Sequence, residues 1–152
     1  MKNVLLLSIK PQYARKIFDG SKTVELRRIR PKYLKDGDLI LVYESAPVKA
    51  LVGAFEVEKV IEDSIGRLWK KIENKSAISK PEYDAYFEGA STGVGIFVRD
   101  VWKLPKPITL ENLKQEPYLF TPPQSFRYAT DSESELALTS QPQYYQEELN
   151  IS

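Results

Sequence analysis

The amino-acid sequence predicts an α+β fold: a small, strongly bent β-sheet or barrel of about five to six strands with helices on its rim. Five segments have the apolar and β-branched composition of strands, and four shorter segments have the spacing or the end signals of helices. Their order is not the regular alternation of a doubly wound parallel sheet. At 152 residues, the chain is long enough to bury a single core.

The first third of the chain should contain three strands and one helix. The near-continuous apolar run of residues 3–9 is typical of a central strand that is covered on both faces. Pro11 is tolerated in the first turn of the helix that follows, and Gly20 ends this helix. Residues 22–28 form the second strand, and a glycine-containing turn leads into a third, buried strand over residues 39–43.

Two long strands are predicted in the middle of the chain. The first covers residues 49–61, and Gly53 within it suggests a bulge or the close approach of another element. The second covers residues 92–104 and is rich in Val, Ile and Phe. We expect it to end at Pro105 and Pro107, because proline cannot donate a hydrogen bond to a neighbouring strand.

Three helices are predicted around the last strand. Apolar residues in the segment 65–72 follow the i, i+3, i+4, i+7 spacing of an amphipathic helix. Ser79 and Glu82 have the spacing of a capping box and begin a second helix, which Gly89 ends. A short helical stretch should follow the last strand at residues 110–114.

The sequence contains neither histidine nor cysteine, and this limits the chemistry of any site. Imidazole- or thiolate-bound zinc, a Ser-His-Asp triad and a cysteine nucleophile are excluded. Any catalysis would therefore use Lys, Glu, Asp, Tyr, Ser or Thr, and we expect neither a metal nor a cofactor. No apolar run approaches the roughly 20 residues of a membrane span, so we expect no contact with a membrane and a cytoplasmic location.

The net charge of +1 conceals an uneven distribution of charge. Residues 131–152 contain five acidic residues and no Lys or Arg, whereas residues 10–35 contain nine basic residues and two acidic ones. Concentrated positive charge attracts the phosphates of nucleic acids, although a solvated lysine-rich surface would have the same composition. We expect residues 1–130 to form the folded domain and residues 131–152 to form an acidic, flexible tail.

The strand over residues 22–28 carries a cluster of charged residues. Because side chains alternate across a strand, Thr23, Glu25 and Arg27 should share one face, opposite the apolar residues of the strand. Lys22 could contact a phosphate, act as a base if burial lowered its pKa, or simply pair with Glu25. Glu25 could accept hydrogen bonds from the amino group of a cytosine- or adenine-like base. Arg27 and Arg28 could bind phosphates in a bidentate manner.

The pattern Gly-x-Lys-x-x-Glu-x-Arg over residues 20–27 resembles the signature of ASCH domains, which are relatives of the RNA- and modified-base-binding PUA and EVE domains. Further motifs agree in their order: Ser8-Ile9-Lys10-Pro11 before the signature, Gly37-Asp38 before a buried strand, and Tyr86-Phe87-x-Gly89 before the last strand. The likeness covers residues 1 to about 128. It implies an ASCH domain over residues 1–130 with a PUA-like β-barrel and a cleft for a nucleic acid or nucleoside.

This resemblance implies a binding module for nucleic acid, RNA in the first place, or for a modified nucleoside, with a regulatory role. The alternative is an enzyme with Lys22 and Glu25 as catalytic residues: an amidohydrolase acting on N4-acylated cytidine, or a ribonuclease. In the amidohydrolase branch, a Lys and a Thr of this strand act with a distant Glu. The lysine matches Lys22, but Glu25 occupies the place of the threonine, and a carboxylate cannot simply replace a hydroxyl nucleophile.

Further residues are expected to complete the binding site. Three cations would form an outer rim for phosphates, two tyrosines would offer stacking surfaces, and two polar residues after a stiff Pro-Pro pair would form a wall or lid. In that order they are Lys10, Arg30 and Lys32; Tyr86 and Tyr128; and Gln124 and Ser125. The rest of the predicted site is Lys22, Glu25, Arg27 and Arg28. For Tyr43 we expect core packing, and for Ser45 an ordinary turn. The acidic tail could also occupy the basic cleft when no ligand is bound.

Overall fold

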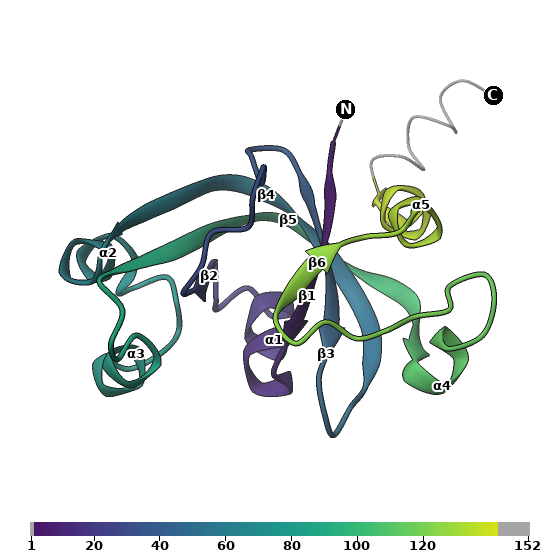
Figure 1. The fold of residues 1–152 in the computed structure, drawn as a ribbon, viewed down its shortest axis with the longest axis horizontal. Helices are drawn as coiled ribbons and strands as arrows, with labels where there is room; N and C mark the ends of the chain where they lie inside the picture. Colours follow the sequence, from purple (N-terminus) through teal and green to yellow (C-terminus); the bar gives the residue numbers. More distant parts are fainter. Residues whose placement is uncertain (1, 143–152) are drawn as a thin grey trace.

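The fold is a strongly curved sheet of six strands with five helices around its rim (Figure 1). The computed structural model describes residues 2–142. The strands are β1 (Val4–Ile9), β2 (Val24–Arg27), β3 (Leu39–Glu44), β4 (Ala50–Ser64), β5 (Thr92–Thr109) and β6 (Phe126–Tyr128). The helices are α1 (Pro11–Phe18), α2 (Ile65–Ile72), α3 (Lys80–Tyr86), α4 (Leu110–Leu113) and α5 (Asp131–Ser140). The predicted α+β class and the bent-sheet architecture are confirmed.

The strands follow the order β2-β5-β4-β3-β1-β6 in a sheet that forms a half-barrel. β1 and β3 are parallel, and all other neighbouring strands are antiparallel. β2 and β6 are therefore the two edges of the sheet. β1 and β3 are inner strands and are almost entirely buried, as the apolar run of residues 3–9 predicted.

Three apolar clusters hold the helices against the sheet. The first lies on one face and includes Ile17 of α1 and Phe55 of β4. The second lies on the opposite face and includes Leu113 of α4 and Ala137 of α5. The third packs α2 and α3 against the far end of the β4–β5 ribbon, around Tyr83 (Figure 1). None of the helices in residues 2–142 is long and apolar enough to cross a membrane.

Gly53 lies at a bulge of β4, as predicted. The register between β4 and its neighbours shifts at this residue. A Cβ atom on Gly53 would lie 2.4 Å from the carbonyl oxygen of Trp102 and 2.6 Å from the ring of Phe18. The glycine therefore allows β5 and α1 to approach the backbone closely, and the bulges bend the long ribbon.

The predicted end of the last strand at Pro105 and Pro107 is wrong, because β5 continues to Thr109. Gly53 pairs with Lys103, and the next paired residue of β4, Leu51, is opposite Ile108. Both prolines thus lie in the stretch of β5 that the ladder skips, where no hydrogen bond from a backbone N–H is needed.

The predicted flexible tail is also wrong for residues 131–140, which form α5. The helix begins with a capping box in which Thr130 and Glu133 bond each other's backbone N–H groups. Glu133 and Ala137 are fully buried, and Trp102 donates a hydrogen bond of 3.0 Å to Ser140. Packing against the sheet thus stabilises a segment whose composition alone favours disorder. Residues 143–152 lie outside the described part of the chain.

Candidate functional site

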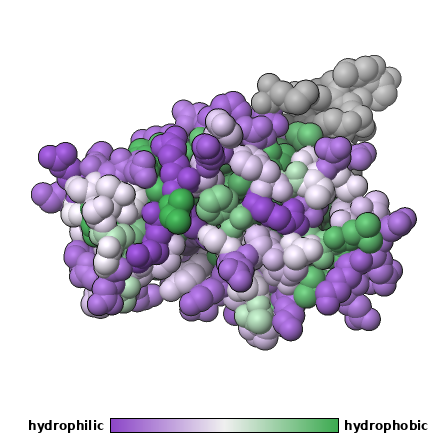
Figure 2. Space-filling view, in the orientation of Figure 1, coloured by the Kyte–Doolittle hydropathy of each residue, from purple (hydrophilic) through white to green (hydrophobic). Residues whose placement is uncertain are grey.

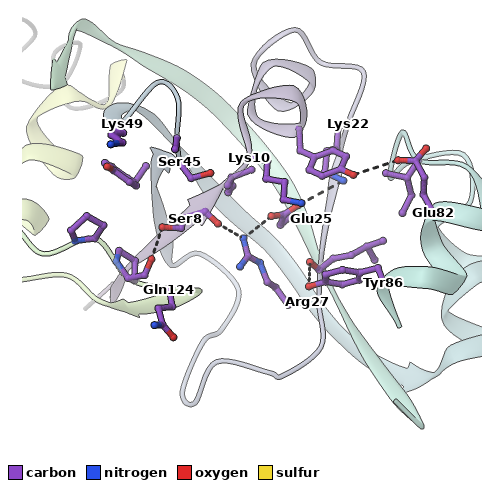
Figure 3. A pocket seen from close by; sticks show the side chains of 18 of the residues that line it. Ser8, Lys10, Lys22, Glu25, Arg27, Ser45, Lys49, Glu82, Tyr86 and Gln124 are labelled. Atoms are coloured by element: carbon purple, nitrogen blue, oxygen red, sulfur yellow. Dashed lines mark hydrogen bonds and ion pairs between the residues drawn. The ribbon is translucent and has the colours of Figure 1, made fainter. Parts of the chain in front are cut away.

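A cavity of about 540 Å³ opens between the two edges of the half-barrel (Figure 3). Glu25 and Arg27 lie in its centre; Lys22, Glu82 and Tyr86 lie on one side, and Ser45, Lys49 and Gln124 lie on the other. The lining contains four basic residues (Lys10, Lys22, Arg27, Lys49) and two acidic ones, and is therefore net positive. On the face shown in Figure 2, hydrophobic groups are visible in the middle among hydrophilic ones.

The floor of the cavity is a row of three charged side chains, Lys22, Glu25 and Arg27, which we call the charged row. One carboxylate oxygen of Glu25 lies 2.9 Å from Nη2 of Arg27, and the other lies 3.7 Å from Nζ of Lys22. The exposed fractions of the three residues are only 2–9%. Glu25 and Arg27 share one face of β2, and Val24 and Leu26 pack on the other face against α2 and α3, as the alternation predicted.

Lys22 is tied to the backbone as well as to Glu25. Its ammonium donates a hydrogen bond of 2.7 Å to the carbonyl oxygen of Ser76. Burial lowers the pKa of Lys22, and the neighbouring carboxylate of Glu25 opposes this shift. The salt bridge to Glu25 and the position in the cavity, which from the sequence were alternatives, thus occur together.

Arg27 bridges the two edges of the sheet. Its Nη2 donates 2.9 Å to the carbonyl oxygen of Ser8 on β1, and its Nη1 donates 3.1 Å to Oγ of Ser125, immediately before β6. No ladder of backbone hydrogen bonds joins the edges β2 and β6, and Arg27 spans the space between β2 and the residues beside β6. The gap that this leaves in the barrel is the cavity.

Tyr86 forms a half-exposed wall of the cavity at the end of α3. Its hydroxyl donates 3.2 Å to the carbonyl oxygen of Leu26, and its ring packs edge-on against Phe87. Arg28 fixes this end of the helix by donating to the carbonyl oxygens of Tyr86 and Glu88, at 2.8 and 3.0 Å. Arg28 thus lies at the rim with its guanidinium partly occupied by the backbone.

The structure brings together six of the eleven predicted site residues. These six, Lys10, Lys22, Glu25, Arg27, Tyr86 and Gln124, line the cavity. Ser125 contacts Arg27 next to the cavity, and Arg28 contacts Tyr86 from outside. Arg30, Lys32 and Tyr128 do not line it: both cations are exposed on the loop between β2 and β3, and the Tyr128 hydroxyl donates to the carbonyl oxygen of Lys32.

The predictions missed the side of the cavity around the end of β3, which we call the β3 side: Tyr43, Ser45 and Lys49. Tyr43 packs on Phe120 in the core, as expected, but it also lines the cavity. Burial raises the pKa of Tyr43. Among the described residues, the hydroxyls of Tyr43 and Ser45 have no hydrogen-bond partner and Lys49 has no ion pair. The turn after β3 carries no sequence signal for such a role.

Within residues 2–142, no group of three or more Asp or Glu side chains lies in an arrangement that could hold a metal ion. The cavity presents ammonium, guanidinium, carboxylate and hydroxyl groups. Such groups can bind phosphate, accept hydrogen bonds from a base and transfer protons.

The half-barrel and the cavity at its open edge define a PUA-like domain. The family model of the ASCH domain matches residues 7–116, and the chain belongs to the ASCH family. The resemblance seen in the signature of residues 20–27 is thereby confirmed.

Known proteins with similar sequences and structures support this assignment. An ASCH domain-containing ribonuclease of Zymomonas mobilis is 32% identical over 138 residues, which are 90% of this chain and 92% of that protein. A crystal structure of ASCH from Zymomonas mobilis has a TM-score of 0.81 at 29% identity and covers 90% of this chain and 94% of its own. The N-terminal domain of Staphylothermus marinus McrB shares only the fold, with a TM-score of 0.57 at 13% identity over 91% of this chain and 94% of its own.

Proposed function

We propose that the chain binds single-stranded RNA in the cytoplasm and cleaves it, with one nucleotide of the RNA in the cavity. The observation that carries this proposal is a net positive cavity with a carboxylate at its floor and a tyrosine at its wall. The similarity of this chain to a Zymomonas ribonuclease, over nearly the whole of both proteins, supports the proposal that the ligand is RNA and that it is cleaved.

The charged row and Tyr86 would hold the base. A carboxylate has about four lone-pair sites, so Glu25 can accept a hydrogen bond from an exocyclic amino group in addition to its contacts with Lys22 and Arg27. Tyr86 is 40% exposed and lines the cavity, so its ring would be the stacking surface for the base. Lys10 lies exposed at the N-terminus of α1 and would contact a phosphate.

The β3 side of the cavity is the better candidate for the chemistry than Lys22 and Glu25. The ammonium of Lys22 is engaged by Ser76 and Glu25, which suits a fixed binding contact. The hydroxyl of Tyr43 and the ammonium of Lys49 have no such partners among the described residues. Burial raises the pKa of Tyr43, which keeps its proton available to a departing oxygen.

A balanced cleavage step follows from these groups. The 2′-hydroxyl of the bound nucleotide loses its proton to a solvent water and attacks the adjacent phosphorus, and the bond to the 5′-oxygen of the next nucleotide breaks. Tyr43 gives its proton to that 5′-oxygen, and Lys49 stabilises the charge on the phosphoryl oxygens. The products are a 2′,3′-cyclic phosphate and a 5′-hydroxyl.

Purified protein should be tested on labelled single-stranded RNA, on DNA of the same sequence and on 2′-O-methyl RNA. We expect binding to RNA and to 2′-O-methyl RNA but cleavage only of RNA. Tyr43→Phe should retain binding and lower the cleavage rate by about 10²-fold or more, as loss of a general acid does. Lys70→Met, which removes an exposed lysine of α2 outside the cavity, should leave both properties unchanged.

Binding should also weaken with salt, and Lys10→Met should flatten the slope of log K against log salt by about 0.7, the value for one phosphate contact on a single strand. Absence of RNA binding at low salt would overturn the proposal. Turnover of N4-acetylcytidine that Lys22→Met abolishes would instead support the amidohydrolase alternative. RNA binding without cleavage would reduce the function to that of a binding module.

A further inference from the structure

We infer that the loop between β2 and β3, residues 28–38, is a second contact surface for single-stranded RNA, on which the ring of Tyr33 stacks a base outside the cavity. This inference rests on the proposed RNA function and adds a subsite to it. Nothing in the sequence patterns assigned a role to Tyr33.

Two large apolar side chains of this loop are unusually exposed. Tyr33 is 74% exposed and Ile29 is 70% exposed, the highest values for large hydrophobic residues in the described part of the chain. Neither Tyr33 nor Ile29 belongs to any of the three apolar clusters of the fold. Single exposed apolar side chains are common on folded proteins, so the order of the loop and the charge around Tyr33 decide its role.

The loop is held in place although its tip is exposed. Leu34, the residue after Tyr33, is only 2% exposed and anchors the loop in the core. Asn3 donates 3.4 Å to the carbonyl oxygen of Tyr33, and the Tyr128 hydroxyl donates to the carbonyl oxygen of Lys32. Tyr33 itself has a φ of 68°, a left-handed conformation that a tyrosine keeps only where its neighbours enforce it. A ligand therefore meets a ring whose backbone is already ordered, which lowers the entropy cost of binding.

Two cations of the loop, Arg30 and Lys32, precede Tyr33 closely in the sequence. Arg30 and Lys32 are exposed, and no acid among the described residues pairs with them. The ammonium of Lys32 lies 5.7 Å from the centre of the Tyr33 ring. An aromatic face flanked by unpaired cations suits a polyanion with stackable bases, because bases stack on the ring while phosphates meet the cations. This combination favours single-stranded RNA over an apolar protein partner.

The loop is continuous with both sides of the cavity. It begins directly after Arg27, and Arg28 donates to the backbone of Tyr86 at the cavity wall. Its middle is tied through Lys32 to Tyr128 on β6, the strand that follows Gln124 of the opposite wall. A strand of RNA that leaves the cavity along this loop would pass the exposed Arg30 and Lys32 before it meets Tyr33.

The test compares 2′-O-methyl RNA oligomers of about 4 and about 12 nucleotides, which the protein should bind without cleaving them; this range covers short and long single-strand sites. We would measure their binding by fluorescence anisotropy to wild type, Tyr33→Ala and Tyr33→Phe. Tyr33→Ala should weaken binding of the long oligomer by about 5- to 150-fold, the effect of losing one base–aromatic stack. It should change binding of the short oligomer, which the cavity alone can hold, by less than about twofold. Tyr33→Phe keeps the ring and should behave as wild type.

Each other outcome has a definite meaning. If wild type binds neither oligomer, the proposed function itself fails. If wild type binds both and Tyr33→Ala binds the long one equally well, the second surface is refuted while the RNA function stands. An equal loss in Tyr33→Phe would refute stacking in favour of a hydrogen bond from the hydroxyl. A change of oligomeric state on light scattering in Tyr33→Ala would show that the patch serves contacts between protein chains.

Discussion

Replacing Glu25 with glutamine removes the negative charge from the middle of the charged row while keeping its shape. Glu25 is 6% exposed and lies 2.9 Å from Nη2 of Arg27 and 3.7 Å from Nζ of Lys22. Without the carboxylate, two largely buried cations face each other across a neutral amide. Removing one partner of a buried ion pair costs about 3–5 kcal/mol. Lys22 and Arg27 keep their bonds to the carbonyl oxygens of Ser76 and Ser8, so we expect a loss of about 2–4 kcal/mol.

The assay is urea unfolding at neutral pH, followed by the fluorescence of the two tryptophans. Glu58→Gln, which changes an exposed carboxylate on β4, is the matched control and should stay within about 0.5 kcal/mol of wild type. The double variant Lys22→Met/Glu25→Gln should be more stable than the sum of the two single changes predicts, because it also removes one of the two buried cations that lose the carboxylate of Glu25. Strict additivity, or a Glu25→Gln protein as stable as the control, would show that the charged row is not coupled.

Two further predictions concern the scaffold. Gly53→Ala should lower the free energy of unfolding by about 1–3 kcal/mol, because the new Cβ atom would lie 2.4 Å from the carbonyl oxygen of Trp102. Gly66→Ala, in the open first turn of α2, should instead raise this free energy by up to about 1 kcal/mol. Urea unfolding measures both variants, and equal effects would contradict the close contact at Gly53. Burial raises the pKa of Glu133, but the hydrogen bonds from Arg127 and Thr130 and the positive charge of Arg127 together outweigh burial and hold the pKa below the ordinary 4.5. The stability from this pair should be complete above pH 4.5 and decline as the pH falls further, and Glu133→Gln should flatten that decline in unfolding curves recorded at several pH values.

The local features of the site could be predicted because they depend on neighbouring residues. Alternation along β2 placed Glu25 and Arg27 on one face, and the glycine in β4 marked a bulge. The β3 side of the cavity could not be predicted, because Ser45 and Lys49 come to face the charged row only through the curvature of the whole sheet. Sequence patterns report the face of a strand but not how far a sheet bends.

The two errors about the fold, the end of β5 and the helix α5, have different physical causes. Proline was expected to end β5, but the bulge removes the need for backbone donors at Pro105 and Pro107. The helix α5 did have a signal, the capping-box spacing of Thr130 and Glu133, which the acidic composition of the segment concealed. Local capping was therefore a better indicator of structure there than overall composition.

The bridge that Arg27 forms between β2 and β6 also bears on the solubility of the protein. The free edges of a sheet can recruit strands from other molecules and so begin aggregation, and short edge strands resist this. Here the two edge strands are the shortest of the sheet, with four and three residues, and a guanidinium ties them together. Such short edges offer few backbone groups to an incoming strand, and Arg27 holds Ser125, the residue before β6, beside β2.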